Sequence, residues 1–187
     1  MPRNRRPRDR AEKRAEIVAA ARRLFVGQGY ESVSMTRIAR EAGVVSNTVY
    51  WYFQDKDAVL IAVLDEVLTE AMDRYRAVAE VELTDRLVWM VGELEQVNRL
   101  VTTVHARSKE SATVGEWHDR FHTLAEDLFR IELIELGCTD QDLDAVITLG
   151  VFVIEGLLMH PADEPGKRAV ISTLVRSARG LAVTTTP

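Results

Sequence analysis

The sequence predicts an all-α protein in which a helix-turn-helix domain at the N-terminus precedes a longer helical domain. Residues 34–53 contain two short amphipathic segments separated by Gly43. From residue 56 onward, apolar residues recur at helical spacing, and no segment shows the two-residue alternation of a strand. Charge is also divided along the chain: residues 1–60 contain 12 Lys/Arg and 7 Asp/Glu, whereas the remainder contains 12 and 22. This division indicates a basic module joined to an acidic one.

Residues 34–53 contain the local signals of a helix, a tight turn and a second helix. Ser34 can cap the first helix with its hydroxyl, and Ile38 lies on the apolar face that follows. Gly43 can take the left-handed conformation of a helix C-terminus without a steric penalty. Val49 and Phe53 begin a second apolar face almost at once, so only a short turn is left between the helices. This pattern is typical of a helix-turn-helix, whose second helix enters the DNA major groove.

The exposed face predicted for the second helix carries side chains that suit DNA. The amide of Asn47 can pair with the N6 and N7 atoms of adenine, and Ser46 can read a neighbouring base. Trp51 has two interpretations: it packs against an adjoining helix, or it contacts thymine methyl groups and the sugar backbone. At the start of the preceding helix, Thr36 and Arg37 are candidate phosphate contacts. We therefore predict a double-stranded DNA surface on these two helices.

Five further helices follow from the apolar periodicity. They are predicted at residues 56–79, 84–104, 111–136, 141–159 and 167–182. Gly137 and Pro161 end two of them, because glycine favours a helix C-terminus and proline disfavours helix at the residue before it. The longest apolar run, residues 145–154, is well short of the ~20 residues that cross a bilayer. No membrane segment is predicted.

The last two predicted helices are apolar over unusually wide faces. Their apolar residues are Val146, Leu149, Val153, Leu157 and Leu158 on one, and Val170, Leu174, Val175, Ala178 and Leu181 on the other. Such helices must be buried, either in the core of one chain or in a four-helix bundle between two copies. We favour the homodimer, because it would hold two recognition helices about 34 Å apart on a palindromic DNA site.

The cysteine count and the charge of the N-terminus bear on the compartment of the protein and on its DNA contacts. Cys138 is the one cysteine of the 187-residue chain, so no internal disulfide can form and a reducing compartment such as the cytoplasm is expected. The N-terminus carries a basic run, Arg3, Arg5, Arg6, Arg8 and Arg10. This run is either a solvated tail or an arm that adds phosphate or minor-groove contacts, and both interpretations remain open.

A pair of histidines raises the question of a metal. His118 and His122 are four residues apart on a predicted helix, a spacing that suits metal binding. Neither His105 nor His160 is near them in sequence, so no third ligand is evident. A hydrogen-bonded or solvated pair is the favoured interpretation. The sequence predicts no metal, no cofactor and no catalytic residue.

One block of residues resembles a known family. The block comprises Ile17-Val18-Ala19-Ala20-Ala21-Arg22-Arg23-Leu24-Phe25, Gly29, Ile38-Ala39, Ala42-Gly43-Val44, Thr48-Val49-Tyr50, Tyr52-Phe53, Lys56 and Leu60. It is similar to the DNA-binding domain of the TetR family over about the first third of the chain. Val45 and Asn47 depart from the usual pattern, which shifts the expected start of the second helix to Ser46.

The resemblance implies roles that the residues alone do not. Thr48, Tyr50, Tyr52 and Lys56 match positions that contact phosphates in the family, and dimerisation would use the last two helices. A small-molecule pocket is implied among the middle helices, for a largely apolar ligand. Candidate lining residues are Trp89, Met90, Trp117, Phe121, Phe129 and Phe152. Glu155 would meet a basic group of the ligand, a partner across the dimer, or solvent.

Three classes of function remain in view. The resemblance favours a sequence-specific transcriptional regulator, acting as a homodimeric repressor that a small ligand releases. Residues 1–55 would form the arm and DNA-binding domain, and residues 56–187 the effector-binding and dimerisation domain. The alternatives are an architectural DNA-binding protein without an inducer and a helical metal-dependent enzyme that uses His118 and His122. The first alternative would bind DNA almost without regard to sequence.

Overall fold

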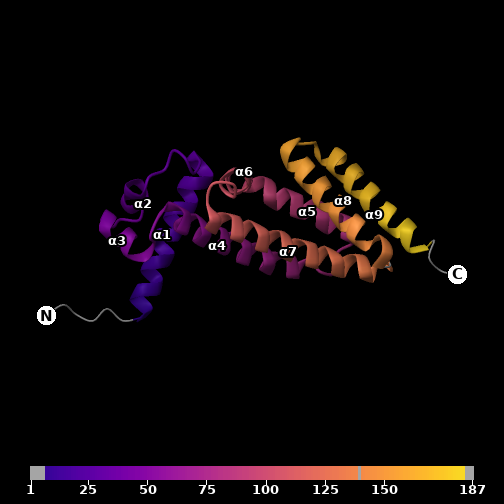
Figure 1. The fold of residues 1–187 in the computed structure, drawn as a ribbon, viewed down its shortest axis with the longest axis horizontal. Coiled ribbons are helices and arrows are strands. Elements are labelled where there is room, and N and C mark those ends of the chain that lie inside the picture. The colour runs from indigo at the N-terminus through magenta and orange to yellow at the C-terminus, as the bar shows by residue number, and fades with distance from the viewer. Residues whose placement is uncertain (1–6, 139, 184–187) are drawn as a thin grey trace. The chain divides into compact units, whose positions relative to one another are not determined.

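The computed structural model describes residues 7–138 and 140–183, and these residues form nine α-helices and no strands. The helices are α1 (Pro7–Gln28), α2 (Met35–Glu41), α3 (Ser46–Tyr52), α4 (Lys56–Ala77), α5 (Leu83–Gln96), α6 (Asn98–Arg107), α7 (Ala112–Glu135), α8 (Asp140–Met159) and α9 (Glu164–Val183) (Figure 1). The predicted all-α class is confirmed. Arg3, Arg5 and Arg6 lie outside the described residues, as do the side chains of Arg8 and Leu181.

The chain divides into two compact units that are not continuous in sequence. The first unit comprises residues up to Glu70 together with Arg99–His118. The second comprises Ala71–Asn98 and the chain from Asp119 onward. The long helices α4 and α7 therefore each belong partly to the first unit and partly to the second.

In the first unit, the helix-turn-helix forms as the local signals predict. The backbone N–H of Arg37 donates to Ser34 Oγ at 3.1 Å, which caps α2. Gly43 has a φ of 66°, and the N–H of Val44 donates to the carbonyl of Ala39 at 2.9 Å. This pattern closes α2 and leaves a short turn before α3 begins at Ser46, where the sequence placed it.

A shared apolar core holds α1, α2, α3 and the first part of α4 together. Its fully buried members include Ile17, Phe25, Ile38, Val49, Val59 and Leu60. Because Val49 points into this core, the opposite face of α3 is turned to solvent. The core thus fixes which side chains of α3 are available to a partner.

Two predicted helix boundaries were wrong. The helix predicted at residues 84–104 is two helices, α5 and α6, because the N–H of Val97 bonds back to Leu94 at 3.1 Å and the backbone leaves the helical conformation. Helix α9 begins at Glu164 rather than after Gly166. Proline is tolerated in the first turn of a helix, and the Asp163 carboxylate accepts the N–H of Gly166 at 2.9 Å.

In the second unit, α5, α8 and α9 pack on one another, with α8 and α9 side by side (Figure 1). One buried cluster comprises Leu83, Leu87, Val88, Val91, Leu157, Ile171 and Val175. A second comprises Leu133, Cys138, Leu143, Val146, Ile147 and Ala178. Phe129 of α7 packs against both clusters, so it joins α7 to the remaining helices of the unit.

The approach of Phe129 to α8 requires a glycine. A Cβ added to Gly150 would lie 3.0 Å from Phe129 Cδ1 and closer still to Cε1. We expect Gly150→Ala to lower the free energy of unfolding by about 1–3 kcal/mol, because the packed ring must move. Gly156 on the same helix is the control, since no atom lies within 4 Å of the corresponding Cβ.

Gly156→Ala should leave stability unchanged or raise it by about 0.5–1 kcal/mol, because alanine favours helix. Denaturant titrations followed by circular dichroism measure both variants. Equal effects of the two substitutions would contradict the close packing of Phe129 on Gly150.

The second unit also buries a charged cluster. Arg86 of α5 pairs with Glu132 of α7, and the hydroxyl of Tyr75 donates to Glu132 Oε1 at 2.8 Å. Only 10% of the Arg86 side chain and 11% of the Glu132 side chain are exposed. Burial and the hydrogen bond to Glu132 raise the pKa of Tyr75 to about 12. This cluster was not predicted from the sequence.

The apolar residues of α8 and α9 fall into a buried set and an exposed set. Val146, Leu157, Leu158, Leu174, Val175 and Ala178 are buried within the chain. Leu149, Phe152, Met159 and Val170 are exposed, by 49%, 65%, 65% and 42%. The chain's own core therefore accounts for part of the wide apolar faces but not for all of them. No helix in the described part of the chain is both long and apolar enough to cross a membrane.

Candidate nucleic-acid interface

The solvent-facing side of α3 carries an amide and two large aromatic rings. Asn47 is exposed, and Tyr50 and Trp51 are 54% and 61% exposed. Ser46 and Thr48 are half-buried at the start of the helix. Adjacent exposed apolar side chains form a continuous patch, and such patches often mark a binding surface. Of the predicted DNA contacts on α3, the structure thus leaves Asn47, Tyr50 and Trp51 exposed, whereas Ser46, Thr48 and Tyr52 are half-buried.

The N-terminal part of α1 lies against this face. The guanidinium carbon of Arg10 lies 4.3 Å from the centre of the Trp51 ring, and Trp51 meets Tyr52 edge-on with ring centres 4.8 Å apart. Arg14 lies 5.1 Å from the ring centre of Phe53. Trp51 therefore packs against a neighbouring helix, as the first interpretation predicted. It also remains largely exposed, as the predicted contact with DNA requires.

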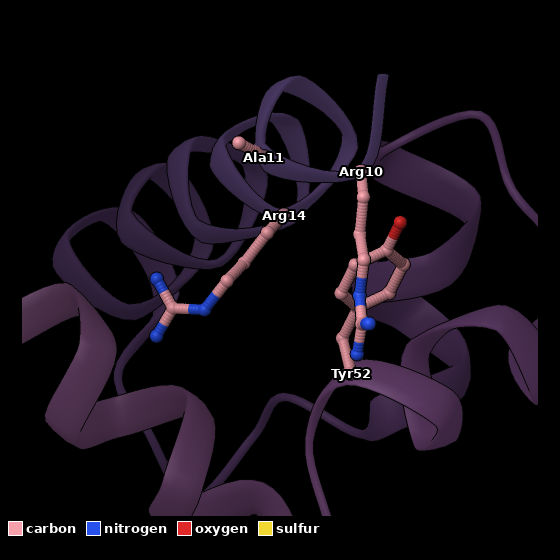
Figure 2. Close-up of a pocket in the computed structure, with 4 residues that line it drawn as sticks. All are labelled: Arg10, Ala11, Arg14 and Tyr52. Atoms are coloured by element: carbon pink, nitrogen blue, oxygen red, sulfur yellow. The ribbon is translucent and has the colours of Figure 1, made fainter. Parts of the chain in front are cut away.

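An open hollow of about 330 Å³ lies between α1 and α3, lined by Arg10, Ala11, Arg14 and Tyr52. Figure 2 shows Arg10 beside the Tyr52 ring and Arg14 projecting from the next turn of α1. Two guanidinium groups at the edge of α3 add positive charge where a phosphate backbone would pass. Arg14 was not predicted from the sequence, because its position four residues after Arg10 becomes significant only once α1 is placed against α3.

The remaining DNA-contact candidates lie at the starts of α2 and α4. Thr36 is exposed and Arg37 is half-buried in the first turn of α2. Lys56 is the first residue of α4, where its Nζ donates to the carbonyl oxygen of Tyr30 at 3.0 Å and lies 3.9 Å from the Tyr30 ring centre. Lys56 therefore ties α4 to the loop between α1 and α2. Its contact with phosphate remains a prediction.

Tyr30 also belongs to a network that reaches α6 within the first unit. Its hydroxyl donates to one oxygen of Asp57, and Arg107 Nη2 donates to the other at 2.7 Å. Burial tends to raise the pKa of Asp57, but hydrogen bonds from Arg107, Tyr30 and Ser111 outweigh it and lower the pKa. Burial of the Tyr30 hydroxyl and its hydrogen bond to Asp57 raise the pKa of Tyr30.

The lowered pKa of Asp57 predicts a contribution to acid unfolding. Because its folded pKa lies below the ordinary 3.8, Asp57 stabilises the fold at neutral pH, and this stabilisation is lost as the pH falls through the folded pKa. We expect Asp57→Asn to lose less stability than wild type between about pH 6 and pH 3. Denaturant titrations at several pH values test this. The exposed Asp127→Asn should keep the wild-type slope, and an unchanged slope in Asp57→Asn would contradict the assignment.

The candidate ligand-lining residues are distributed over both units. Trp117 is buried in the first unit and donates its indole N–H to Asp65 Oδ1 at 2.8 Å. In the second unit, Met90 and Phe129 pack against the core, and the Trp89 ring lies 6.4 Å from the Tyr75 ring. Half-buried Phe121 meets the His122 ring edge-on at 5.9 Å, while Phe152 is exposed.

Glu155 has a partner within the chain that the sequence analysis did not foresee. One carboxylate oxygen lies 3.6 Å from His122 Nε2, and 37% of the Glu155 side chain is exposed. Its interruption of the apolar helix α8 is therefore accommodated by a polar neighbour on α7 together with partial solvent contact.

Comparison with known proteins identifies the segment that builds this interface. Residues 17–63 match the family described as bacterial regulatory proteins, tetR family. The transcriptional regulator HbdR of Aromatoleum sp. is 34% identical over 105 residues, which are 54% of this chain and 46% of that protein. The regulator TtgR of Pseudomonas putida is 37% identical over 98 residues, or 51% and 46% of the two chains. The chain thus spans less than half the length of these two relatives.

The fold comparison extends over most of the chain. A TetR transcription regulator from Haloarcula marismortui superimposes with a TM-score of 0.70 at 20% identity, covering 93% of this chain and 98% of that one. The family match runs from Ile17 of α1 to Val63 of α4, both fully buried in the core that presents α3. Residues 17–63 therefore match the tetR family of bacterial regulatory proteins, as the sequence predicted, and the fold of the chain is similar to that of a TetR transcription regulator.

Proposed function

We propose that this chain is a sequence-specific transcriptional regulator that acts as a homodimer in the cytoplasm. The dimer binds a palindromic operator and represses transcription until a small, largely apolar ligand releases it. The observation that carries the proposal is the solvent-facing side of α3, where Asn47, Tyr50 and Trp51 stand exposed above a buried core. An amide beside two aromatic rings suits base edges and sugar in a major groove. Residues 1–55 are proposed as the arm and DNA-binding domain, and residues 56–187 as the effector and dimerisation domain.

Each DNA-contacting side chain has a proposed role. Asn47 reads adenine, Ser46 reads a neighbouring base, and Trp51 contacts thymine methyl groups or sugar. Thr36, Arg37, Thr48, Tyr50, Tyr52 and Lys56 are proposed to contact phosphates. Arg10 and Arg14 join this set because they flank α3. Phosphate contacts position the protein, and the base contacts supply the specificity.

The exposed apolar residues of α8 and α9 support the homodimer. Leu149, Phe152 and Met159 follow one another at helical spacing on α8, and Val170 adds to them on α9. A second copy would remove this surface from water. Phe152 is therefore better placed for the dimer interface than for a ligand pocket. The remaining proposed ligand contacts are Trp89, Met90, Trp117, Phe121, Phe129 and Glu155.

A fluorescence-anisotropy titration at fixed salt tests the proposed function. Labelled duplexes tiled across the DNA that flanks the gene are compared with an unrelated duplex of equal length. We expect one palindromic tile to bind at least about 1,000-fold more tightly than the unrelated duplex. Equal, steeply salt-dependent binding to every duplex would instead indicate an architectural protein.

A further inference from the structure

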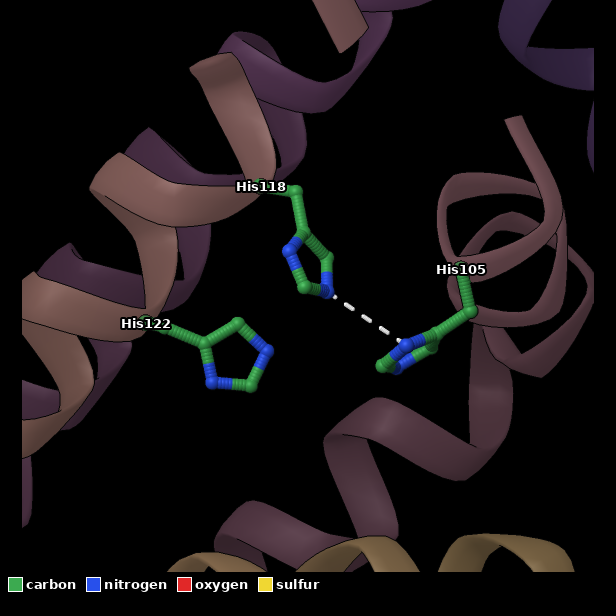
Figure 3. Close-up of side chains that lie close together, drawn as sticks. All are labelled: His105, His118 and His122. Carbon is green, nitrogen blue, oxygen red and sulfur yellow. Dashed lines mark hydrogen bonds between the residues drawn. The ribbon is translucent and has the colours of Figure 1, made fainter. Parts of the chain in front are cut away.

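Three of the four histidines converge in the structure. His105 of α6 lies beside His118 of α7, with their ring centres 4.9 Å apart and the planes at 76°. His122 follows on α7, and one ring nitrogen from each residue lies within 4.8 Å of the other two. Figure 3 shows the three rings turned toward one another. No third partner for His118 and His122 was predicted from the sequence, because His105 comes thirteen residues before His118.

The relative placement of these side chains is set locally. His105 and His118 both belong to the first unit, where the two rings contact each other directly. His122 is one turn further along the same continuous helix, so the helix itself holds it on the face of His118. The cluster thus depends on one helix pair and one helical turn.

The distances suit a tetrahedral metal ion. Zinc binds imidazole nitrogen at about 2.0–2.1 Å, which places two ligand nitrogens about 3.3–3.4 Å apart in a tetrahedron. The nitrogens His118 Nε2 and His105 Nδ1 are 3.4 Å apart. In the structure this approach is a hydrogen bond between the two rings. A metal ion bound to both nitrogens would replace the proton that the two rings share, and rotation of the His122 ring would bring its nitrogen to the same ion.

We infer that this chain binds one divalent transition metal ion of the zinc class through His105, His118 and His122. Three imidazoles select zinc, nickel or copper over magnesium and calcium, which prefer oxygen ligands. All three histidines are half-buried, so an ion can reach them without unfolding the chain. The Glu155 carboxylate, 3.6 Å from His122 Nε2, adds negative charge beside the site. Three protein ligands would leave the fourth position to water or another small ligand.

Isothermal titration of the full chain with zinc chloride tests the inference, in a buffer without competing ligands. We expect one zinc ion per chain. His105→Gln, His118→Gln and His122→Gln should each weaken zinc binding at least about 100-fold. Loss of a residue that only orients a ligand already weakens metal affinity about 10–100-fold, and loss of the ligand itself should weaken it at least as much. Glu155→Gln should weaken it about tenfold. The fourth histidine supplies the matched control: His160 is exposed at the end of α8, and His160→Gln should bind zinc as wild type does.

The outcomes separate a metal site from a structural cluster. Circular dichroism in the presence of a chelator first establishes that each variant retains the helix content of wild type. Zinc should then raise the melting temperature of wild type and His160→Gln but not of the three ligand variants. If His118→Gln fails to fold, His105→Gln tests the site from the other helix. No saturable binding by wild type, or equal binding by wild type and the three ligand variants, would overturn the inference. Neither result depends on DNA binding.

Discussion

Glu132→Ala should lower the free energy of unfolding by about 3–5 kcal/mol, the largest effect we expect from a single substitution in the second unit. The substitution removes the carboxylate that pairs with Arg86 and accepts the hydroxyl of Tyr75. It leaves a guanidinium in a site where only 10% of the Arg86 side chain is exposed, and Arg86 Nε already has no hydrogen-bond partner among the described residues. The cost is that of a buried charge without its counter-ion.

Two controls isolate this cause. The double variant Arg86→Met/Glu132→Leu removes both charges and should recover most of the lost stability, because an apolar pair can replace a buried ion pair. Asp144→Ala breaks the exposed pair between Arg130 and Asp144 and should cost less than about 1 kcal/mol. Denaturant titration measures all three variants. If Glu132→Ala cost no more than Asp144→Ala, the cluster would not be a buried, mutually dependent set.

Asn47→Ala should weaken binding to the operator by about 1–3 kcal/mol per half-site while leaving binding to unrelated DNA nearly unchanged. Asn47 is exposed on α3, whereas Val49 anchors the helix in the core. Truncation of the Asn47 amide should therefore not disturb the fold. The expected loss reflects the bidentate pairing of the amide with one base. Anisotropy titrations on the operator and on an unrelated duplex measure the two affinities.

Arg37→Ala is the matched comparison for a phosphate contact. It should weaken binding to both duplexes alike and reduce the slope of log affinity against log salt by about 1. Lys56 is unsuited to this comparison, because its contacts with Tyr30 couple DNA affinity to the stability of the fold. Equal losses on both duplexes for Asn47→Ala and Arg37→Ala would contradict the separation of base reading from phosphate contact.

Much of the interface was predictable because its signals are local. The cap at Ser34, the positive φ of Gly43 and the start of α3 at Ser46 depend on residues within one or two turns of each other. The exposed face of α3 follows in the same way, since Val49 and Phe53 mark the side that must be buried. Boundaries were less predictable at Val97 and Glu164, where single hydrogen bonds decide where a helix stops or starts.

Features that join distant residues became visible only in the folded chain. Arg86 and Glu132 are 46 residues apart, and each alone resembles an ordinary charge on an amphipathic helix. His105 looked isolated until the packing of α6 on α7 brought it to His118, and Arg10 reached Trp51 only through the packing of α1 on α3. Helix periodicity determines which side of a helix is buried, but it does not determine the neighbour that buries it. Local sequence was therefore sufficient for the DNA-reading helix, whereas tertiary packing decided the buried ion pair and the histidine cluster.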